Sequence, residues 1–92
     1  MSEREKRYKI VLTKQAEKSL LKIKKSNSRL VAKIANNIDA LAEDPMRGIP
    51  LTGSLKGLWK LRVGDYRIIY FIEKDKLVIC VIPIGYRRDV YR

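Results

Sequence analysis

The stretch from Leu58 to Tyr70 constrains the fold of this chain more than any other. Apolar and aromatic residues alternate with basic ones on either side of the dipeptide Gly64-Asp65. Glycine followed by aspartate is typical of a two-residue turn between antiparallel strands. The turn sets the register of the two strands, so that Val63 faces Tyr66. We therefore predict a β-hairpin in this stretch.

The predicted hairpin carries its basic residues on one face. Successive side chains of a strand point to opposite faces, which puts Lys60, Arg62 and Arg67 on the same side. The register also sets Arg62 opposite Arg67, and like charges in that arrangement destabilise a strand pair. A small domain that keeps these cations is expected to use them for an anionic partner; an exposed basic face without a specific ligand is the alternative. The other face carries apolar and aromatic side chains: Trp59, Leu61, Ile68 and Tyr70.

The overall charge points in the same direction. The chain has 92 residues, which predicts one domain spanning 1–92, and its 21 lysines and arginines against 10 acidic residues give a net charge of +11. Such an imbalance speeds encounter with polyanions. Nucleic acid is the leading expected partner, and an anionic membrane surface or an acidic protein are the alternatives. The two N-terminal clusters of basic residues, 4–9 and 14–25, are expected mainly to form solvated faces.

Cysteine and histidine usage excludes several classes of site. Cys80 is the only cysteine and there is no histidine, so an internal disulfide and the usual zinc-binding patterns are excluded. We expect no metal and no cofactor, and we expect Cys80 to act as a small buried apolar residue. The N-terminus lacks the apolar core of a signal peptide, and no apolar run reaches transmembrane length. The expected location is cytoplasmic, with no membrane partner.

The first half of the chain predicts a strand followed by two helices. Residues 8–12 alternate and favour a strand, and Thr13 is a good N-cap for a helix that continues to about Lys25. The segment 26–28 interrupts the apolar spacing and caps a second helix, which ends at 44–45 because a residue before proline disfavours helical backbone. The apolar stripe of the second helix consists of Leu30, Val31, Ile34, Ile38, Leu41 and Ala42.

The second half predicts an antiparallel sheet. Residues 46–56 are expected to form a loop, residues 73–76 a second turn, and residues 77–82 a strand whose continuous apolar run suggests burial on both faces. The predicted fold class is therefore α+β: an N-terminal strand, a two-helix hairpin and a three-stranded antiparallel meander, with the helices packed on one face of a twisted sheet.

The C-terminal tail adds three candidate site residues. Arg87 and Arg88 follow the end of the last predicted strand, where loops often present functional side chains; a basic terminus without function is the alternative. Tyr91 suits stacking on a base or proton transfer, and from the residues alone a role as a packing anchor is the better interpretation. No Ser/His or Cys/His set, phosphate-binding glycine loop or dinucleotide motif occurs.

These side chains suit one reaction class. RNA is cut without a metal when its own 2′-OH attacks the adjacent phosphate. The protein must then supply cations around the phosphorane-like transition state, together with a proton acceptor and a donor. Preorganised charge of this kind is often the largest catalytic term, and arginine and lysine provide it.

At this level of detail the chain resembles the RelE toxins of the RelE/ParE superfamily. The resemblance covers the order of elements, the approach at 51–59, the hairpin motif at 60–70 and the tail at 85–91. The hairpin motif is shared across the superfamily. The tail, with its basic pair and near-terminal tyrosine, is more specific to the ribonuclease branch.

The resemblance implies roles for individual residues. Lys60 and Arg67 match cations that hold and neutralise the scissile phosphate, and Arg62 matches a frequent additional basic position. Arg87 matches the arginine assigned to leaving-group protonation or phosphate stabilisation, and Tyr91 matches the tyrosine that orients the substrate and helps to activate the 2′-OH. Arg88 is expected to contribute to RNA binding. Two residues depart from the family pattern: Tyr86 replaces a frequent histidine, and Leu58 replaces a lysine found in some relatives.

The resemblance also implies a function. The expected protein is the toxin of a type II toxin–antitoxin system, a metal-independent endoribonuclease that cuts mRNA in the ribosomal A site. The expected partners are the translating ribosome and an acidic antitoxin, with a monomeric toxin that enters a larger complex with that antitoxin. A ParE-like DNA gyrase inhibitor and a non-catalytic RNA-binding relative are the alternatives.

Overall fold

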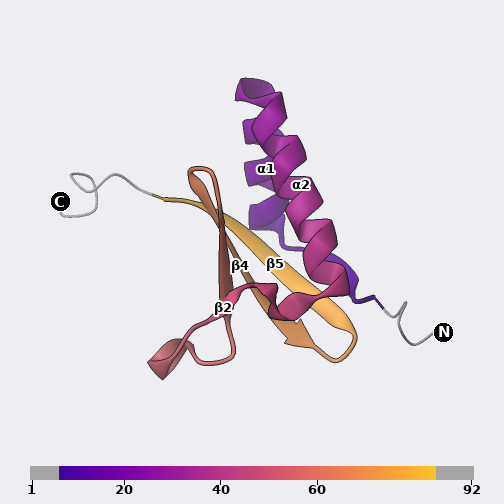
Figure 1. The fold of residues 1–92 in the computed structure, drawn as a ribbon. Helices are drawn as coiled ribbons and strands as arrows, with labels where there is room; N and C mark the ends of the chain where they lie inside the picture. The colour runs from indigo at the N-terminus through magenta and orange to yellow at the C-terminus, as the bar shows by residue number, and fades with distance from the viewer. Residues whose placement is uncertain (1–6, 85–92) are drawn as a thin grey trace.

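The computed structural model describes residues 7–84, and Figure 1 shows a two-helix hairpin lying against a twisted sheet. The predicted residues Arg87, Arg88 and Tyr91 lie outside the described part of the chain. The elements are, in chain order, β1 (Lys9–Leu12), α1 (Lys14–Ser26), α2 (Ser28–Glu43), the 3-10 helix η2 (Pro45–Arg47), β2 (Ile49–Pro50), the 3-10 helix η3 (Gly53–Leu55), β3 (Trp59–Val63), β4 (Tyr66–Glu73) and β5 (Lys76–Pro83).

The sheet has five strands in the order β1-β5-β4-β3-β2. β3, β4 and β5 form the predicted antiparallel meander, while β1 pairs with β5 in parallel. The α+β class and the helical layer on one face are confirmed. The order differs from the prediction in one respect, because the short strand β2 extends the sheet beyond β3 within the segment 46–56 that we expected to be a loop. Two residues, one of them a proline, give too short a pattern to be recognised as a strand.

The helix boundaries follow from capping residues in the sequence. The Thr13 hydroxyl accepts a hydrogen bond from the Ala16 N–H at 3.1 Å, which fixes the start of α1. Asn27 ends α1 and begins α2, and its side chain accepts from the Leu30 N–H at 3.0 Å. Such caps satisfy N–H groups that have no partner inside the helix. A single residue therefore joins the two helices as a tight hairpin.

The core lies between the helices and one face of the sheet. Ile23 of α1, Ile34 and Leu41 of α2, and Ile68 and Ile79 of the sheet are all almost completely buried. In β5, buried residues alternate with half-buried ones up to Val81. The prediction that this strand is buried on both faces was therefore wrong, because both helices cover the same face and an apolar run alone does not reveal a half-buried strand.

The β3–β4 hairpin has the predicted register. Val63 pairs with Tyr66, and Arg62 pairs with Arg67. Gly64 has a φ of 60°, a left-handed conformation that glycine adopts without strain. The turn thus orients both strands so that their basic side chains share one face.

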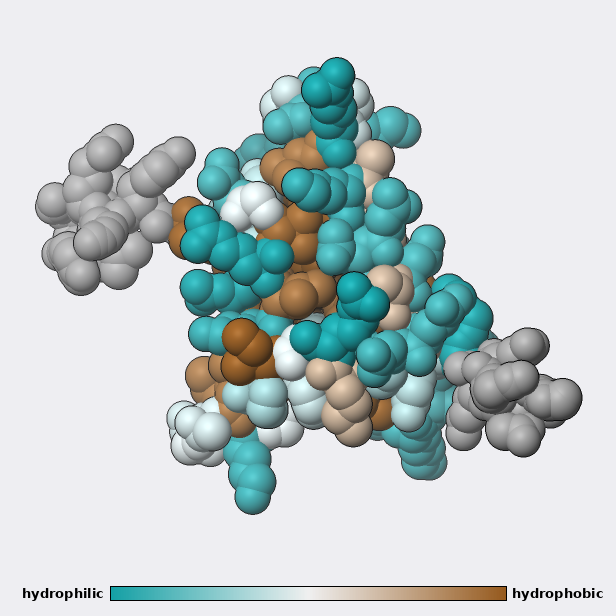
Figure 2. Space-filling view, in the orientation of Figure 1, coloured by the Kyte–Doolittle hydropathy of each residue, from teal (hydrophilic) through white to brown (hydrophobic). Residues whose placement is uncertain are grey.

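The surface seen in Figure 2 is mainly hydrophilic, with smaller hydrophobic patches among the polar side chains. Leu21, Met46 and Ile49 are the most exposed large apolar residues of the described chain, each at least 60% exposed. Within residues 7–84, no helix is long and apolar enough to cross a membrane.

Candidate anion-binding site

A hollow of about 360 Å³ lies at the β2–β3–β4 side of the sheet, and four of its six lining residues are lysine or arginine. Lys60, Arg62 and Arg67 line it, as the hairpin register predicts. Arg47 is a fourth cation in the lining, and the remaining residues are Ile49 and Leu61. The structure therefore brings together all three predicted basic residues of the hairpin.

The three hairpin cations are placed by strand alternation. Lys60 and Arg62 belong to β3, and Arg67 belongs to β4. The Arg62 Nε donates a hydrogen bond to the Gly64 carbonyl oxygen at 3.0 Å, which draws this guanidinium towards the turn. Arg62 and Arg67 are exposed and Lys60 is half-buried, so the cationic groups remain open to a ligand.

The cations of the hollow have no acidic partner within residues 7–84. Arg7 makes the ion pairs of that region, with Glu43 at 2.9 Å and with Asp39 at 3.9 Å. An unneutralised group of cations around one hollow attracts phosphate, because arginine offers several donors in a geometry that matches phosphate oxygens. The arrangement is suited to binding a phosphodiester and to stabilising additional negative charge on it.

Arg47 was missed by sequence reasoning. It lies in η2, inside the segment that we read as a loop. Its only sequence signal is the adjacent Gly48, whose presence reflects a close contact: a side-chain carbon there would meet the Tyr70 hydroxyl and the Lys60 carbonyl oxygen. Contacts of this kind join residues far apart in the sequence and do not appear in a local pattern.

Tyr70 anchors the segment that carries Arg47. Its hydroxyl donates to the Pro45 carbonyl oxygen at 2.7 Å and accepts from the Gly48 N–H at 3.0 Å. Burial raises the pKa of this hydroxyl above its ordinary value; the bond from Gly48 opposes that shift and the charge of Asp44 adds to it. Tyr70 is also stacked on Trp59, with ring centroids 6.2 Å apart.

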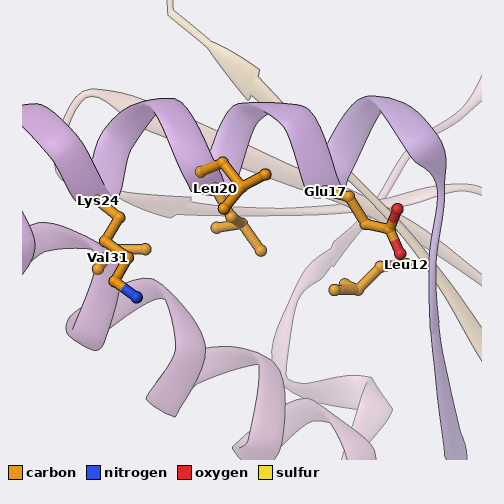
Figure 3. Close-up of a pocket in the computed structure, with 6 residues that line it drawn as sticks. Leu12, Glu17, Leu20, Lys24 and Val31 are labelled. Carbon is orange, nitrogen blue, oxygen red and sulfur yellow. The ribbon is translucent and has the colours of Figure 1, made fainter.

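A second hollow is apolar and lies on the helical side of the molecule. It is formed where α1, α2 and the end of β1 meet, as Figure 3 shows, with Leu12, Leu20 and Val31 as its apolar lining. Glu17, Leu21 and Lys24 complete the lining. Polar groups are scarce there, so this groove suits an apolar side chain of a partner better than an anion.

The outer edge of β1 lies beside this groove. The N–H of Thr13 donates to the Ile79 carbonyl oxygen in β5, and the N–H of Lys9 donates to the carbonyl oxygen of Asp75, the residue before β5. Alternation along a parallel strand directs the backbone groups of Ile10 and Leu12 the other way, and the Tyr8 N–H before them bonds to the Ala42 carbonyl oxygen. No strand in the described sheet pairs with that edge of β1.

The family model for the ParE toxin of the type II toxin–antitoxin system parDE matches residues 10–91. The chain belongs to this family. It is therefore a type II toxin of the RelE/ParE superfamily, which confirms the resemblance seen in the hairpin and the tail. The match extends over nearly all of the sequence, including the segment that carries the hollow.

Curated relatives agree with this assignment. Toxin RelG of Mycobacterium tuberculosis is 34% identical over 53 residues, which cover 56% of this chain and 61% of RelG. The match to RelG thus spans less than two thirds of that protein. Toxin YoeB of a Synechocystis strain is 31% identical over 85 residues, which cover 87% of this chain and 99% of that toxin.

Solved structures share the fold. The toxin–antitoxin complex RelBE2 of Mycobacterium tuberculosis contains a chain with a TM-score of 0.71 and 29% identity, and the match covers 84% of this chain and 98% of that one. A YoeB/ParE toxin from Agrobacterium tumefaciens has a TM-score of 0.72 at 24% identity, covering 85% of this chain and 99% of that one. The two-helix hairpin on a sheet is thus the common architecture of these toxins.

Proposed function

We propose that this toxin is a ribosome-dependent endoribonuclease that cuts mRNA and thereby inhibits translation. The observation that carries the proposal is the hollow lined by Arg47, Lys60, Arg62 and Arg67. The similarity to the toxins RelG and YoeB supports the proposal, because the tail of this chain resembles the ribonuclease branch of the same superfamily. The substrate in this proposal is a single strand of RNA whose scissile phosphate enters the hollow.

The proposed chemistry uses the RNA as its own nucleophile. The 2′-OH attacks the adjacent phosphorus and gives up its proton; the bond to the 5′-oxygen of the next nucleotide breaks and that oxygen takes up a proton, which leaves a 2′,3′-cyclic phosphate and a 5′-OH. Lys60 and Arg67 neutralise the charge that builds up on the phosphorane oxygens, and Arg62 holds the neighbouring phosphate. Removing one such charge stabiliser costs about 10²–10³-fold in rate.

The tail supplies the proton-transfer groups in this proposal. Arg87 is assigned to the leaving oxygen or to a phosphate oxygen, Tyr91 to orienting the substrate and the 2′-OH, and Arg88 to RNA binding. These three residues lie outside the described part of the chain. Their roles therefore depend on the family motif and are tested by substitution.

The decisive experiment maps mRNA ends on translating ribosomes. Cuts inside the A-site codon are expected when purified toxin is added, also with EDTA in excess over added transition metals at a magnesium level that keeps ribosomes intact. Arg67→Ala and Arg87→Ala are each expected to slow cutting by about 10²-fold or more. Lys56→Ala, an exposed lysine outside the hollow, is the matched control and should cut at the parental rate. Intact mRNA with active ribosomes and folded toxin would contradict the proposal.

Inhibition of DNA gyrase is the second candidate function. The specific observation that favours it is the match to the ParE family model. A plasmid-supercoiling assay with purified gyrase separates the two candidates. Loss of supercoiling together with uncut mRNA would support the gyrase-inhibitor alternative, whereas cut mRNA with normal supercoiling would exclude it.

We also propose an acidic antitoxin as the partner that keeps the toxin inactive. The RelBE2 complex and a YoeB–YefM complex of Staphylococcus aureus are toxin–antitoxin assemblies on the same fold. The apolar groove at Leu12, Leu20 and Val31 and the open edge of β1 suit an added strand or a docked helix. Leu21 lines the same groove and is 62% exposed, so Leu21→Asp is expected to weaken that complex while leaving mRNA cutting by free toxin unchanged. Unaltered affinity for the antitoxin would place its contacts elsewhere.

A further inference from the structure

One buried side chain forms hydrogen bonds with both ends of the short helix η2. Tyr70 lies on β4 with no exposed surface. Its hydroxyl donates to the carbonyl oxygen of Pro45, the first residue of η2, and accepts from the N–H of Gly48, the residue that follows η2. Both hydrogen-bonding functions of the hydroxyl are thus directed to the two ends of the same turn.

These hydrogen bonds hold η2 so that Arg47 lies at the hollow. Arg47 is the last residue of η2 and is exposed, and its side chain lines the hollow together with Lys60, Arg62 and Arg67. No ion pair or side-chain hydrogen bond involves Arg47 within the described residues. The backbone on both sides of Arg47 is therefore held, while its guanidinium is available to a ligand.

The contact is too close to tolerate much displacement. A side-chain carbon at position 48 would meet both the Tyr70 hydroxyl and the carbonyl oxygen of Lys60. Immediately after Gly48, Ile49 pairs with Lys60 in the β2–β3 ladder. A packed path thus runs from Tyr70 through Gly48 to the strand that carries Lys60, and it sets the position of Arg47 relative to that lysine.

We propose that Arg47 is a further phosphate-binding cation of the site and that Tyr70 is the positioning residue that holds it there. This inference rests on the proposed function in one respect, namely that the ligand of the hollow is RNA. Arg47 contacts a phosphate that neighbours the one held by Lys60 and Arg67. Tyr70 does not contact the RNA and acts only through the turn.

A double-mutant cycle tests the inference. The probe is a fluorescently labelled single-stranded oligoribonucleotide whose 2′-OH groups are methylated so that it cannot be cut, and its Kd for the toxin is measured at several salt concentrations. Arg47→Ala is expected to weaken binding by about threefold to tenfold and to lower the slope of log K against log salt by about 0.7, the value for one phosphate contact on a single strand. Tyr70→Phe is expected to weaken binding in the same direction when Arg47 is present and to change nothing when Arg47→Ala is also present.

The coupling distinguishes positioning from a general structural effect. If Tyr70→Phe weakens binding equally with and without Arg47→Ala, or leaves both the Kd and the salt slope unchanged, the positioning role is overturned. Tyr66→Phe is the matched control, since it removes a tyrosine hydroxyl from the same strand without touching η2. It should leave the Kd and the salt slope unchanged, with or without Arg47→Ala. Met46→Gly is a second variant that loosens the turn through its backbone, and Met46 is 65% exposed, so its side chain buries little surface on folding. Met46→Gly should weaken binding only in the presence of Arg47.

Failure of the inference and failure of the proposed function give different results. If Lys60→Ala weakens RNA binding and Arg47→Ala does not, the hollow binds RNA and the role of Arg47 alone is overturned. If neither variant weakens binding, the hollow is not the RNA site and both proposals are overturned.

Discussion

Neutralising either arginine of the Arg62–Arg67 pair is expected to stabilise the fold while it impairs the toxin. The two residues are direct neighbours across β3 and β4. Because Val63 and Tyr66 close a two-residue turn as a hydrogen-bonded pair, Arg62 and Arg67 form the next, non-hydrogen-bonded pair, in which Cα atoms are only about 4.5 Å apart. Two guanidinium groups attached there repel each other in the folded protein and are far less constrained in the unfolded chain.

The expected gain in the free energy of unfolding is small because the side chains of Arg62 and Arg67 are both exposed. Cross-strand pairs change stability by about 0.2–1 kcal/mol, and the bond from Arg62 to the Gly64 carbonyl keeps its guanidinium turned towards the hairpin end. We therefore expect the lower half of that range, about 0.2–0.6 kcal/mol for Arg62→Gln or Arg67→Gln. In a domain of this size, such a gain raises Tm by roughly 1–5 °C.

The assay is urea unfolding of Arg62→Gln, Arg67→Gln and the double variant, followed by circular dichroism. Once one arginine is neutralised the repulsion is gone. Neutralising the other arginine should therefore stabilise the single variant less than it stabilises the parent protein. The difference should shrink in 1 M salt, where the screening length falls to about 3 Å. Lys56→Gln, which removes an exposed lysine without a cross-strand cation, controls for the reduced net charge. Additive changes, or a loss of stability in both single variants at low salt, would refute the argument that the pair is repulsive.

Three further predictions concern stability and use urea unfolding at constant temperature. Gly48→Ala should lower the free energy of unfolding by about 1–3 kcal/mol through overpacking against Tyr70 and the Lys60 backbone. A Cβ at Gly53 meets nothing within 4 Å, so Gly53→Ala should show only the backbone cost of its positive φ. Equal losses of stability in the two variants would contradict the packing argument. Asn27→Ala should cost about 1 kcal/mol because it removes the cap of α2, and an unchanged midpoint would show that water replaces the cap. The raised pKa of Tyr70 favours the neutral hydroxyl in the folded state. Its contribution to stability is therefore fully present below the unfolded pKa of about 10 and is lost as pH rises through the folded pKa. The free energy of unfolding should fall more from pH 9.5 to 11.5 in the parent than in Tyr70→Phe, and parallel curves would exclude that linkage.

The fold was predictable where local rules determine it. The Gly64-Asp65 turn fixes the hairpin register, and Thr13 and Asn27 fix the helix starts, because each acts on neighbours a few residues away. The parallel pairing of β1 with β5 was not predicted, since it joins opposite ends of the described chain and depends on how the helices pack. Burial of β5 on one face only follows from the same packing.

The candidate site also contains residues that the sequence predicts and one that it does not. Lys60, Arg62 and Arg67 were predictable because strand alternation puts them on one face. Arg47 was not, because its place depends on hydrogen bonds of Tyr70 to both ends of η2. The roles of Arg87, Arg88 and Tyr91 stay predictions from the family motif.

The position of β5 between β1 and β4 has a consequence for how the protein is made. β1 emerges early in synthesis, yet its only strand partner in the described sheet is β5, the last strand of that sheet. Pairing between such distant segments is slow to form, because loop closure must precede the contact. A chain that is cut or terminated before residue 76 would leave β1 unpaired and would lack the strand that joins β1 to the rest of the sheet. Truncated products of this toxin are therefore expected to be unfolded, harmless and readily degraded, so toxicity requires translation through the whole of β5.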